Sequence, residues 1–262
     1  MPTELERALA FEKAIAARSA ERVVPSRTGH AYFNDSFPHV WYLNFLLVDP
    51  AKDVDPGELA AEAELLHTDA GHSHRLIEIP DEALGARVER FFRRIGWQVD
   101  PMVLMAYRGE GERVEESVQV DEVSREQLIP FREETARAQP WATSEEVVRE
   151  VVAAGEIAAR AGNSRFFAVH VDGRPVAAAE LNSDGRIGEV DDVATLPEFR
   201  RRGYASAIVL RAVEEALASG HDLVFLVAED EDWPRELYAR LGFEAMGRTW
   251  SLLRSPALVA KD

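Results

Sequence analysis

The chain has 262 residues, of which 46% are hydrophobic and 29% charged, a composition ordinary for a soluble globular protein of one or two domains. The absence of cysteine excludes disulfides, thiolate metal sites and cysteine nucleophiles. The formal net charge of −17 repels nucleic acid and anionic membranes, and it favours cationic small molecules in any cleft that the surface lines.

The first half alternates predicted helices and strands. Apolar residues recur at steps of three and four in the helical segments, and short apolar runs lie between them. The predicted helices are residues 3–19, 56–70 and 81–95, and the predicted strands are 40–48, 76–79 and 102–107. The polar, glycine-containing stretch 109–116 then predicts a boundary that divides the chain into domains 1–116 and 117–262.

The second half is predicted to contain more strands. Turn sequences at 172–175 and 182–185 separate three of them, and the first turn indicates a hairpin. The predicted strands are 118–123, 166–171, 176–181, 186–195, 223–228 and 243–253, and the predicted helices are 125–137, 144–161, 205–217 and 233–241. The helix at 205–217 has the most regular apolar spacing of the chain.

The two halves share an order of elements. In each half an apolar strand ends at a proline, Pro50 or Pro197, and a helix, a strand and a second helix follow. Residues 91–97 (FFRRIGW) also parallel residues 237–243 (LYARLGF). This pattern predicts an internal duplication, with chance similarity as the alternative.

A cluster of arginines opens the helix at 205–217, directly after a predicted strand. The first amides of a helix have no intrahelical partner and carry a partial positive charge, which suits a pyrophosphate. Glycine at this point lets a phosphate approach the backbone closely. The residues concerned are Arg200, Arg201, Arg202, Gly203, Tyr204, Ala205 and Ser206. The alternative is a solvated basic turn that binds nothing.

Two motifs resemble the GCN5-related N-acetyltransferase (GNAT) family. Arg200-x-x-Gly203-x-Ala205 resembles its coenzyme loop, Q/R-x-x-G-x-G/A, and Leu237-Tyr238-x-x-Leu241-Gly242-Phe243 resembles its later motif. The resemblance covers roughly residues 166–250. It implies an α/β (α+β) fold of two GNAT-like domains, each with a mixed, mostly antiparallel sheet flanked by helices, and a sheet splayed between the fourth and fifth strands of the C-terminal domain.

The same resemblance implies acetyl-CoA as the acyl donor, held in that splay. The pantetheine arm would contact the backbone of Val193, Ala194 and Thr195, and the pyrophosphate would rest on the amides from Arg201 to Ser206. The chain departs from the family at residues 230–234, where many members carry an asparagine. Here Asp232 is positioned to cap the following helix instead, which puts coenzyme contacts from this segment in doubt.

Acyl transfer to an amine needs a proton acceptor for the amine and a proton donor for the leaving thiolate. Glu189 and Asp191 lie two apart on a predicted strand and share a face, whereas Asp192 is expected to point the other way. By resemblance, Glu189 is the candidate general base and Tyr238 the candidate acid. The alternatives are an acidic wall that only shapes the substrate pocket, for Glu189, and a core aromatic, for Tyr238.

No metal site is expected. His67, His72 and His74 are close in sequence, but no neighbouring histidine or carboxylate completes an obvious ligand pattern. The N-terminal half is expected to be a degenerate copy that cannot hold acyl-CoA in the same manner. When the halves are aligned on their prolines, Asp53 and Pro56 replace Arg200 and Gly203, and Phe92 replaces Tyr238.

These features predict an N-acyltransferase that moves an acetyl group from acetyl-CoA to an amine, either a small cationic molecule or an exposed amino group. A non-catalytic acyl-CoA-binding or sensing module is the alternative. No secretory signal or membrane-spanning run is visible, so we expect a cytoplasmic protein without a membrane or nucleic-acid partner. The oligomeric state, a homodimer included, stays open.

Overall fold

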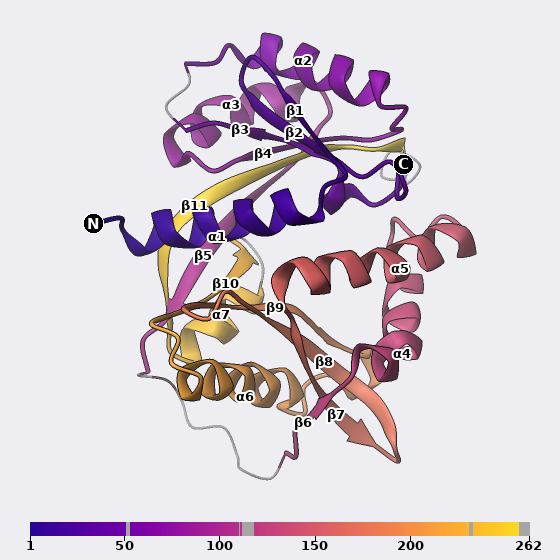
Figure 1. Ribbon diagram of the computed structural model, residues 1–262, viewed down its shortest axis with the longest axis vertical. Helices are drawn as coiled ribbons and strands as arrows, with labels where there is room; N and C mark the ends of the chain where they lie inside the picture. The colour runs from indigo at the N-terminus through magenta and orange to yellow at the C-terminus, as the bar shows by residue number, and fades with distance from the viewer. Residues whose placement is uncertain (51–52, 110, 112–117, 231–232, 257–262) are drawn as a thin grey trace.

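A computed structural model gives the fold of the chain (Figure 1). It describes residues 1–50, 53–109, 111, 118–230 and 233–256. The strands of this part form one 11-stranded sheet of order β1-β2-β3-β4-β11-β5-β10-β9-β8-β7-β6, with helices on both faces. Among these described residues, no helix has the length and apolar character that crossing a bilayer requires.

The N-terminal half begins each of its α-helices with a capping side chain. Thr3, Asp55 and Asp81 accept hydrogen bonds from amides of the first turn and so satisfy donors that the helix itself leaves unpaired. The helices are α1 (Glu4–Ser19), the 3-10 helix η1 (Trp41–Leu43), α2 (Pro56–Asp69) and α3 (Glu82–Arg94). The strands are β1 (Arg22–Pro25), β2 (Gly29–Phe33), β3 (Phe45–Val48), β4 (Arg75–Ile79) and β5 (Gln98–Tyr107).

The C-terminal half follows the predicted order closely. Its strands are β6 (Asp121–Val123), β7 (Arg165–Val171), β8 (Arg174–Ser183), β9 (Ile187–Thr195), β10 (Leu223–Glu229) and β11 (Phe243–Arg254). Its helices are α4 (Arg125–Arg137), α5 (Glu145–Gly162), η2 (Pro197–Phe199), α6 (Tyr204–Ala218) and α7 (Trp233–Arg240). The regular apolar spacing of α6 buries one face of that helix against the sheet, with Ile208, Val209, Ala212, Val213 and Ala216 in the core.

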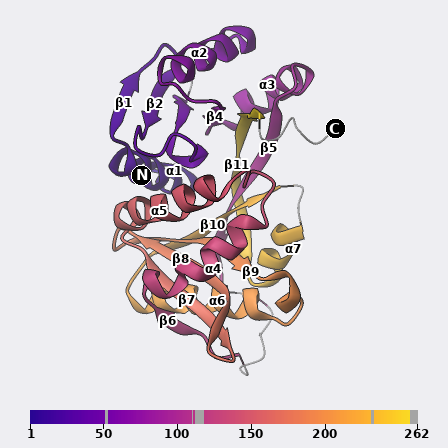
Figure 2. The same cartoon turned by 90° about the vertical axis from the view of Figure 1, so that its right-hand side faces the viewer.

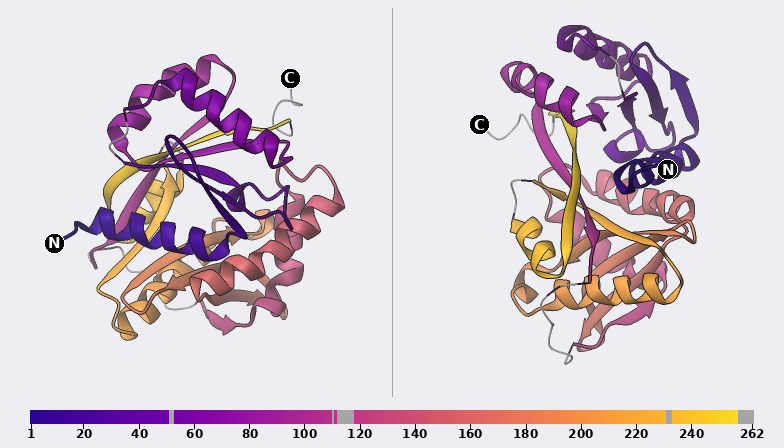
Figure 3. Two further views of the ribbon diagram at one scale, coloured as in Figure 1. Left: turned by 45° about the horizontal axis from the view of Figure 1, so that its top comes forward. Right: turned by 90° about the vertical axis from the view of Figure 1, so that its left-hand side faces the viewer.

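Two long strands join the halves. β5 of the N-terminal half lies between β10 and β11, and β11 of the C-terminal half lies between β4 and β5. Each half therefore inserts its last strand between two strands of the other, which Figure 1 and the right panel of Figure 3 show as a magenta and a yellow strand spanning the molecule. The predicted boundary at 116/117 falls within residues 112–117, which lie outside the described residues, and it stays a proposal.

Helix α1 lies at the junction of the halves. Its Phe11 packs edge-on against Phe225 of β10, with ring centroids 5.9 Å apart, and also joins Leu104 of β5 in one apolar cluster. Arg18 Nε donates to the carbonyl oxygen of Ala161 at 2.7 Å, which ties α1 to the end of α5 (Figure 2). The N-terminal helix thus becomes one wall of the space above the C-terminal sheet.

Local polar contacts explain where the predicted strands fail. Residues 40–48 form η1 and then β3 instead of one strand, because the buried side chain of Asn44 bonds to the backbone of Asn34, Phe37 and Val40. The sequence analysis also missed β1 and β2. β1 is a short edge strand that contains arginine and proline, residues typical of protected sheet edges.

Candidate active site

The N-terminus of α6 has no side-chain cap. Its N-cap is Gly203, with φ of +79°, and the preceding turn contains Arg201 with φ of +61°. A helix leaves its first amides without intrahelical partners, so those of Tyr204, Ala205 and Ser206 are available to a ligand. Thr195, at the end of the strand before this turn, has a buried hydroxyl with no hydrogen-bond partner among the described residues.

The three arginines beside this helix end are exposed and carry their charge unneutralised. Arg200 Nε donates to the carbonyl oxygen of Thr195 at 3.3 Å. Arg202 donates to the carbonyl oxygen of Glu198 at 3.1 Å, and its guanidinium lies 5.1 Å from the centre of the Phe199 ring. Within the part of the chain that the structure describes, none of Arg200, Arg201 and Arg202 forms an ion pair with a carboxylate. In a chain of charge −17, three exposed guanidinium groups without a carboxylate partner are available to an anion.

The sheet opens next to this position. β9 and β10 pair only from Ile187 to Glu189, after which β10 continues against β5 while β9 continues against β8. This is the predicted splay between the fourth and fifth strands of the C-terminal half, and it is confirmed. Val193, Ala194 and Thr195 lie on the part of β9 that has left β10, within reach of any molecule held in the gap.

A bulge in β9 changes the direction of one acidic side chain. The register with β8 shifts beside Asp192, whose φ is +48°. The sequence analysis was wrong to place Asp192 on the face opposite Glu189 and Asp191, because this extra residue breaks the strand alternation. Asp192 lines the same pocket as the other two, and its carboxylate lies 2.5 Å from Arg132.

That pocket lies between the halves and has a volume of about 650 Å³. α1 and the segment around η1 form its N-terminal wall, and α4, α5, β8 and β9 form its C-terminal wall. Acidic residues outnumber basic ones among its lining: Glu12, Glu180, Glu189, Asp191 and Asp192 against Arg125 and Arg132. The remaining lining is largely apolar and includes Ile15, Leu128 and Trp141.

The pocket and α6 lie on opposite faces of β9. Side chains alternate along a strand, so Glu189 and Asp191 face the pocket while Gly188 and Val190 face the other way. A Cβ at Gly188 would lie 3.3 Å from the Cβ of Ala216 in α6. A molecule that reaches from the α6 N-terminus into the pocket must therefore pass through the splay of the sheet.

Burial raises the pKa values of several carboxyl groups in this pocket. The pKa of Glu180 is raised to about 8, mainly by burial and also by the charge of Asp192. Burial and the charge of Asp191 raise the pKa of Glu12 to about 8. The pKa of Glu189 is raised well above its usual value by the same two causes. Crowded carboxyl groups of this kind hold protons until a cation arrives.

A hydrogen-bond chain fixes Glu189. Asn182 Nδ2 donates to Glu189 Oε2 at 3.1 Å, and Ser164 Oγ donates to Asn182 Oδ1 at 2.5 Å. The sequence analysis placed Asn182 in a turn, but β8 extends through Ser183 and carries Asn182 in its last two residues. The contribution of Glu12 was also missed, since no local pattern connects α1 with β9.

Tyr238 lies in α7, with only 8% of its surface exposed, and packs against Phe243 at a ring separation of 6.1 Å. Burial, with a smaller contribution from the charge of Asp191, raises the pKa of Tyr238 to about 12. The phenol therefore keeps its proton at neutral pH, and it is close enough to Asp191 to sense that charge. Asp232, the expected cap of α7, lies outside the described residues.

Residues 123–243 match the model of the "Acetyltransferase (GNAT) family". The C-terminal half of the chain is a GNAT domain. An uncharacterised N-acetyltransferase of Methanocaldococcus jannaschii is 33% identical over 87 residues, which cover 30% of this chain and 38% of that protein. The chain thus spans well under two thirds of that relative's length.

Two solved structures share the fold of almost the whole chain. A conserved protein of unknown function from Staphylococcus epidermidis is similar with a TM-score of 0.70 and 16% identity, over 91% of this chain and 95% of that one. A tandem GNAT protein from the clavulanic acid biosynthesis pathway is similar with a TM-score of 0.57 and 15% identity, over 96% and 94%. The GNAT domain is accordingly part of a fold with two GNAT-like halves.

Proposed function

We propose that this chain is an acyltransferase that moves an acetyl group from acetyl-CoA directly to the amine of a small cationic molecule. The uncapped N-terminus of α6 carries the proposal. It combines free amides, unpaired arginines and an adjoining gap in the sheet. An anion with a long flexible arm fits this combination, and acyl-CoA is such a molecule.

In the proposed complex the diphosphate rests on the amides from Arg201 to Ser206, with Arg200 and Arg202 at the rim. The pantetheine arm runs along Val193, Ala194 and Thr195 and passes through the splay to the opposite face of β9. Its thioester then reaches the acidic pocket beside Glu189 and Asp191. The opposite placement of α6 and the pocket supports this path, because only the splay connects them.

The pocket supports a cationic acceptor with an apolar body. A bound ammonium group stabilises the charged form of neighbouring carboxyl groups, so its arrival would favour ionisation of Glu189 and Glu12. The apolar walls at Ile15 and Leu128 would take up the rest of the molecule. Because Glu12 belongs to α1, the N-terminal half contributes directly to acceptor selection in this proposal.

The proposed reaction is one direct transfer. The ammonium proton passes to the carboxylate cluster, with Glu189 as the candidate base, held in place by Asn182. The free amine attacks the thioester carbonyl, a carbon–nitrogen bond forms, and the amides near the β9 bulge stabilise the oxyanion. The carbon–sulfur bond then breaks, and the departing thiolate takes the hydroxyl proton of Tyr238. The second amine proton leaves the nitrogen as the neutral amide forms, and it restores the phenol of Tyr238.

We further propose that the N-terminal half is a degenerate copy with no coenzyme of its own. At its corresponding helix, Asp55 accepts hydrogen bonds from the amides of Gly57 and Glu58, so a carboxylate already occupies the position that a phosphate would need. Asp53 pairs with Arg87 at 3.0 Å. Phe92, fully buried, takes the place of Tyr238 without a hydroxyl.

The test measures binding and turnover separately. Calorimetry with acetyl-CoA and CoA should show one site per chain, and release of CoA thiol should depend on an added amine from a panel of cationic and neutral acceptors. Coenzyme binding without any amine-dependent thiol release would favour the acyl-CoA-binding module instead. The absence of both heat and thermal stabilisation with acetyl-CoA would exclude both functions.

A further inference from the structure

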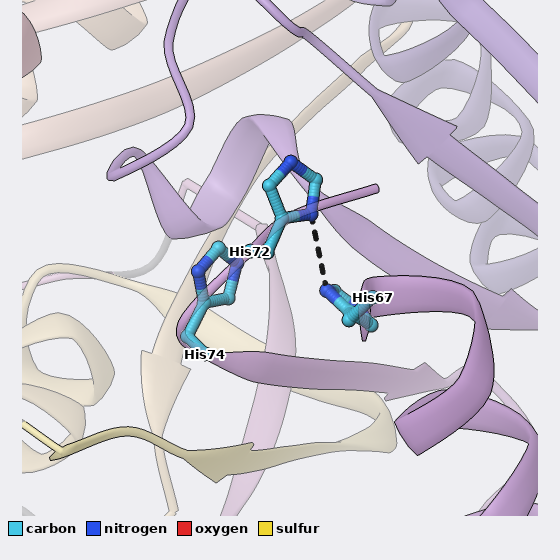
Figure 4. A group of neighbouring side chains, drawn as sticks. All are labelled: His67, His72 and His74. Carbon is cyan, nitrogen blue, oxygen red and sulfur yellow. Dashed lines mark hydrogen bonds between the residues drawn. The ribbon is translucent and has the colours of Figure 1, made fainter. Parts of the chain in front are cut away.

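Three histidines meet in the N-terminal half, outside the lining of the acceptor pocket. His67 lies near the end of α2, and His72 and His74 lie in the loop before β4. All three are buried, with exposed fractions of 0%, 4% and 0%. Each ring offers one nitrogen, and these three atoms lie within 4.8 Å of one another (Figure 4). The Nδ1 atoms of His67 and His72 are 3.4 Å apart.

The outer nitrogens of two rings are held by backbone carbonyl groups. Nε2 of His67 lies 3.3 Å from the carbonyl oxygen of Leu76, and Nε2 of His74 lies 3.0 Å from that of Asn44. A proton on Nε2 of His74 leaves its Nδ1 as a free lone pair. Nε2 of His67 also lies 3.4 Å from the backbone nitrogen of Leu76, so this ring is satisfied in either tautomer, including the one that leaves its Nδ1 free for a metal ion. Proteins orient metal-binding imidazoles by this arrangement, in which the remote N–H donates to a carbonyl or a carboxylate.

The inner nitrogens lack full partners. Among the described residues, the buried Nδ1 of His74 has no hydrogen bond, and the Nδ1 atoms of His67 and His72 have each other as their partner. Nε2 of His72, on the outer side of its ring, is also buried and unpaired. Buried polar atoms are normally paired, and an unpaired one lowers stability unless a water or an ion satisfies it. Phe33 packs edge-on against His67 and His72, and Trp41 lies beside His74, so the surroundings are aromatic.

The spacing suits a small divalent ion. Zinc binds imidazole nitrogen at about 2.0–2.1 Å in tetrahedral geometry, which places two such nitrogens about 3.4 Å apart. The separation of 3.4 Å between His67 and His72 meets this value. The widest separation in the group, up to 4.8 Å, is about 1.4 Å more than this value, so binding requires the rings to move closer by that amount.

We propose that His67, His72 and His74 bind one divalent transition-metal ion of the zinc class, with a water molecule or another donor in the fourth position. The ion would join the end of α2 to the start of β4 and, through His74 and Asn44, to the segment before β3. The sequence analysis expected no metal because it looked for a further ligand nearby in the sequence. Three imidazoles are sufficient for such a site.

The experiment uses the full chain without a histidine tag, treated with a chelator and then titrated with Co²⁺ as a spectroscopic probe. We expect saturation at one Co²⁺ per chain, visible ligand-field absorption, and displacement by one equivalent of Zn²⁺. With Zn²⁺ at a hundred times its dissociation constant, the melting temperature should rise by about 5–10 °C.

His72→Gln should weaken Co²⁺ binding by at least about 100-fold, since it removes one of three ligands. His221→Gln is the matched control: His221 is also buried, but it is paired with Ser183 and Ala216 in the C-terminal half. This control should bind Co²⁺ as the unchanged chain does. Absent or non-saturating binding by the unchanged chain, or equal binding by His72→Gln, would overturn the proposal. The wild-type titration is decisive even if His72→Gln does not fold, and none of these readouts depends on acyl transfer.

Discussion

Replacement of Gly203 by aspartate or by asparagine separates charge from shape at the proposed diphosphate position. Gly203 has φ of +79°, and a Cβ there would meet no other atom within 4 Å. Aspartate and asparagine tolerate this left-handed backbone better than other residues with side chains. Both variants should fold, each with a loss of about 1 kcal/mol in the free energy of unfolding.

The two variants differ only in charge, so their difference in coenzyme affinity can be calculated. A carboxylate at this point would lie about 5 Å from a bound diphosphate, and two unit charges at that distance repel by about 0.8 kcal/mol in water and about 3 kcal/mol at an effective dielectric constant of about 20. Gly203→Asp should therefore bind acetyl-CoA about 4- to 160-fold more weakly than Gly203→Asn. Without coenzyme the order of stability should reverse, because a carboxylate at a helix N-terminus contributes about 0.3–1 kcal/mol.

Calorimetry with acetyl-CoA and thermal melting of the free variants measure both quantities. The reasoning would be refuted by equal dissociation constants for the two folded variants, since a diphosphate at α6 must sense the added charge. A parallel pair at Gly173, in the β7–β8 hairpin, has a φ of +76° and similarly open surroundings. Gly173→Asp and Gly173→Asn should bind acetyl-CoA equally.

Three further predictions follow from the same geometry. Tyr238→Phe should lower kcat about 100-fold in a thiol-release assay, while the affinity for acetyl-CoA measured by calorimetry stays within about twofold of the unchanged chain. A large loss of affinity would count against a role of Tyr238 as proton donor. Burial raises the pKa of Glu180 to about 8, so the protonated carboxyl contributes to the free energy of unfolding below about pH 4.5, and this contribution is lost as the pH rises through 8. In denaturant titrations, Glu180→Gln should remove about 2–4 kcal/mol of the pH dependence of the free energy of unfolding. An unchanged pH profile would contradict the burial of Glu180. Residues 118–262 produced alone should aggregate, because without β5 the edge of β10 from Leu226 to Glu229 is unpaired. Co-expression with residues 1–117 should restore a soluble complex. A stable, monomeric fragment would show that the strand exchange is dispensable.

The parts of the site that were predictable are those set by a short, continuous segment. Three features of the sequence predict the coenzyme loop. They are Gly203, which can adopt positive φ, the neighbouring arginines, and the regular spacing of apolar residues in the helix that follows. All of these act within one turn and the first part of one helix. The splay between β9 and β10 could be expected only because the coenzyme-loop motif resembles that of a known family. No local sequence pattern predicts the residue at which two parallel strands stop pairing.

The acceptor pocket was not predictable, because residues far apart in the sequence form it. Glu12 of α1 and Glu189 of β9 face the same space only after the halves have exchanged β5 and β11, and neither strand carries a local signal for its partner. The bulge at Asp192 likewise depends on the pairing with β8. The grouping of His67, His72 and His74 was likewise not predictable, because their spacing in the sequence matches no short metal-ligand motif.

A crystal structure of the chain with CoA bound tests the central claim most directly. We expect the diphosphate within hydrogen-bonding distance of the amides from Arg201 to Ser206, and the pantetheine thiol in the gap between β9 and β10, pointing toward Asp191. A diphosphate bound elsewhere, such as at the N-terminus of α2, or an arm that stays on the α6 face of the sheet, would contradict the account.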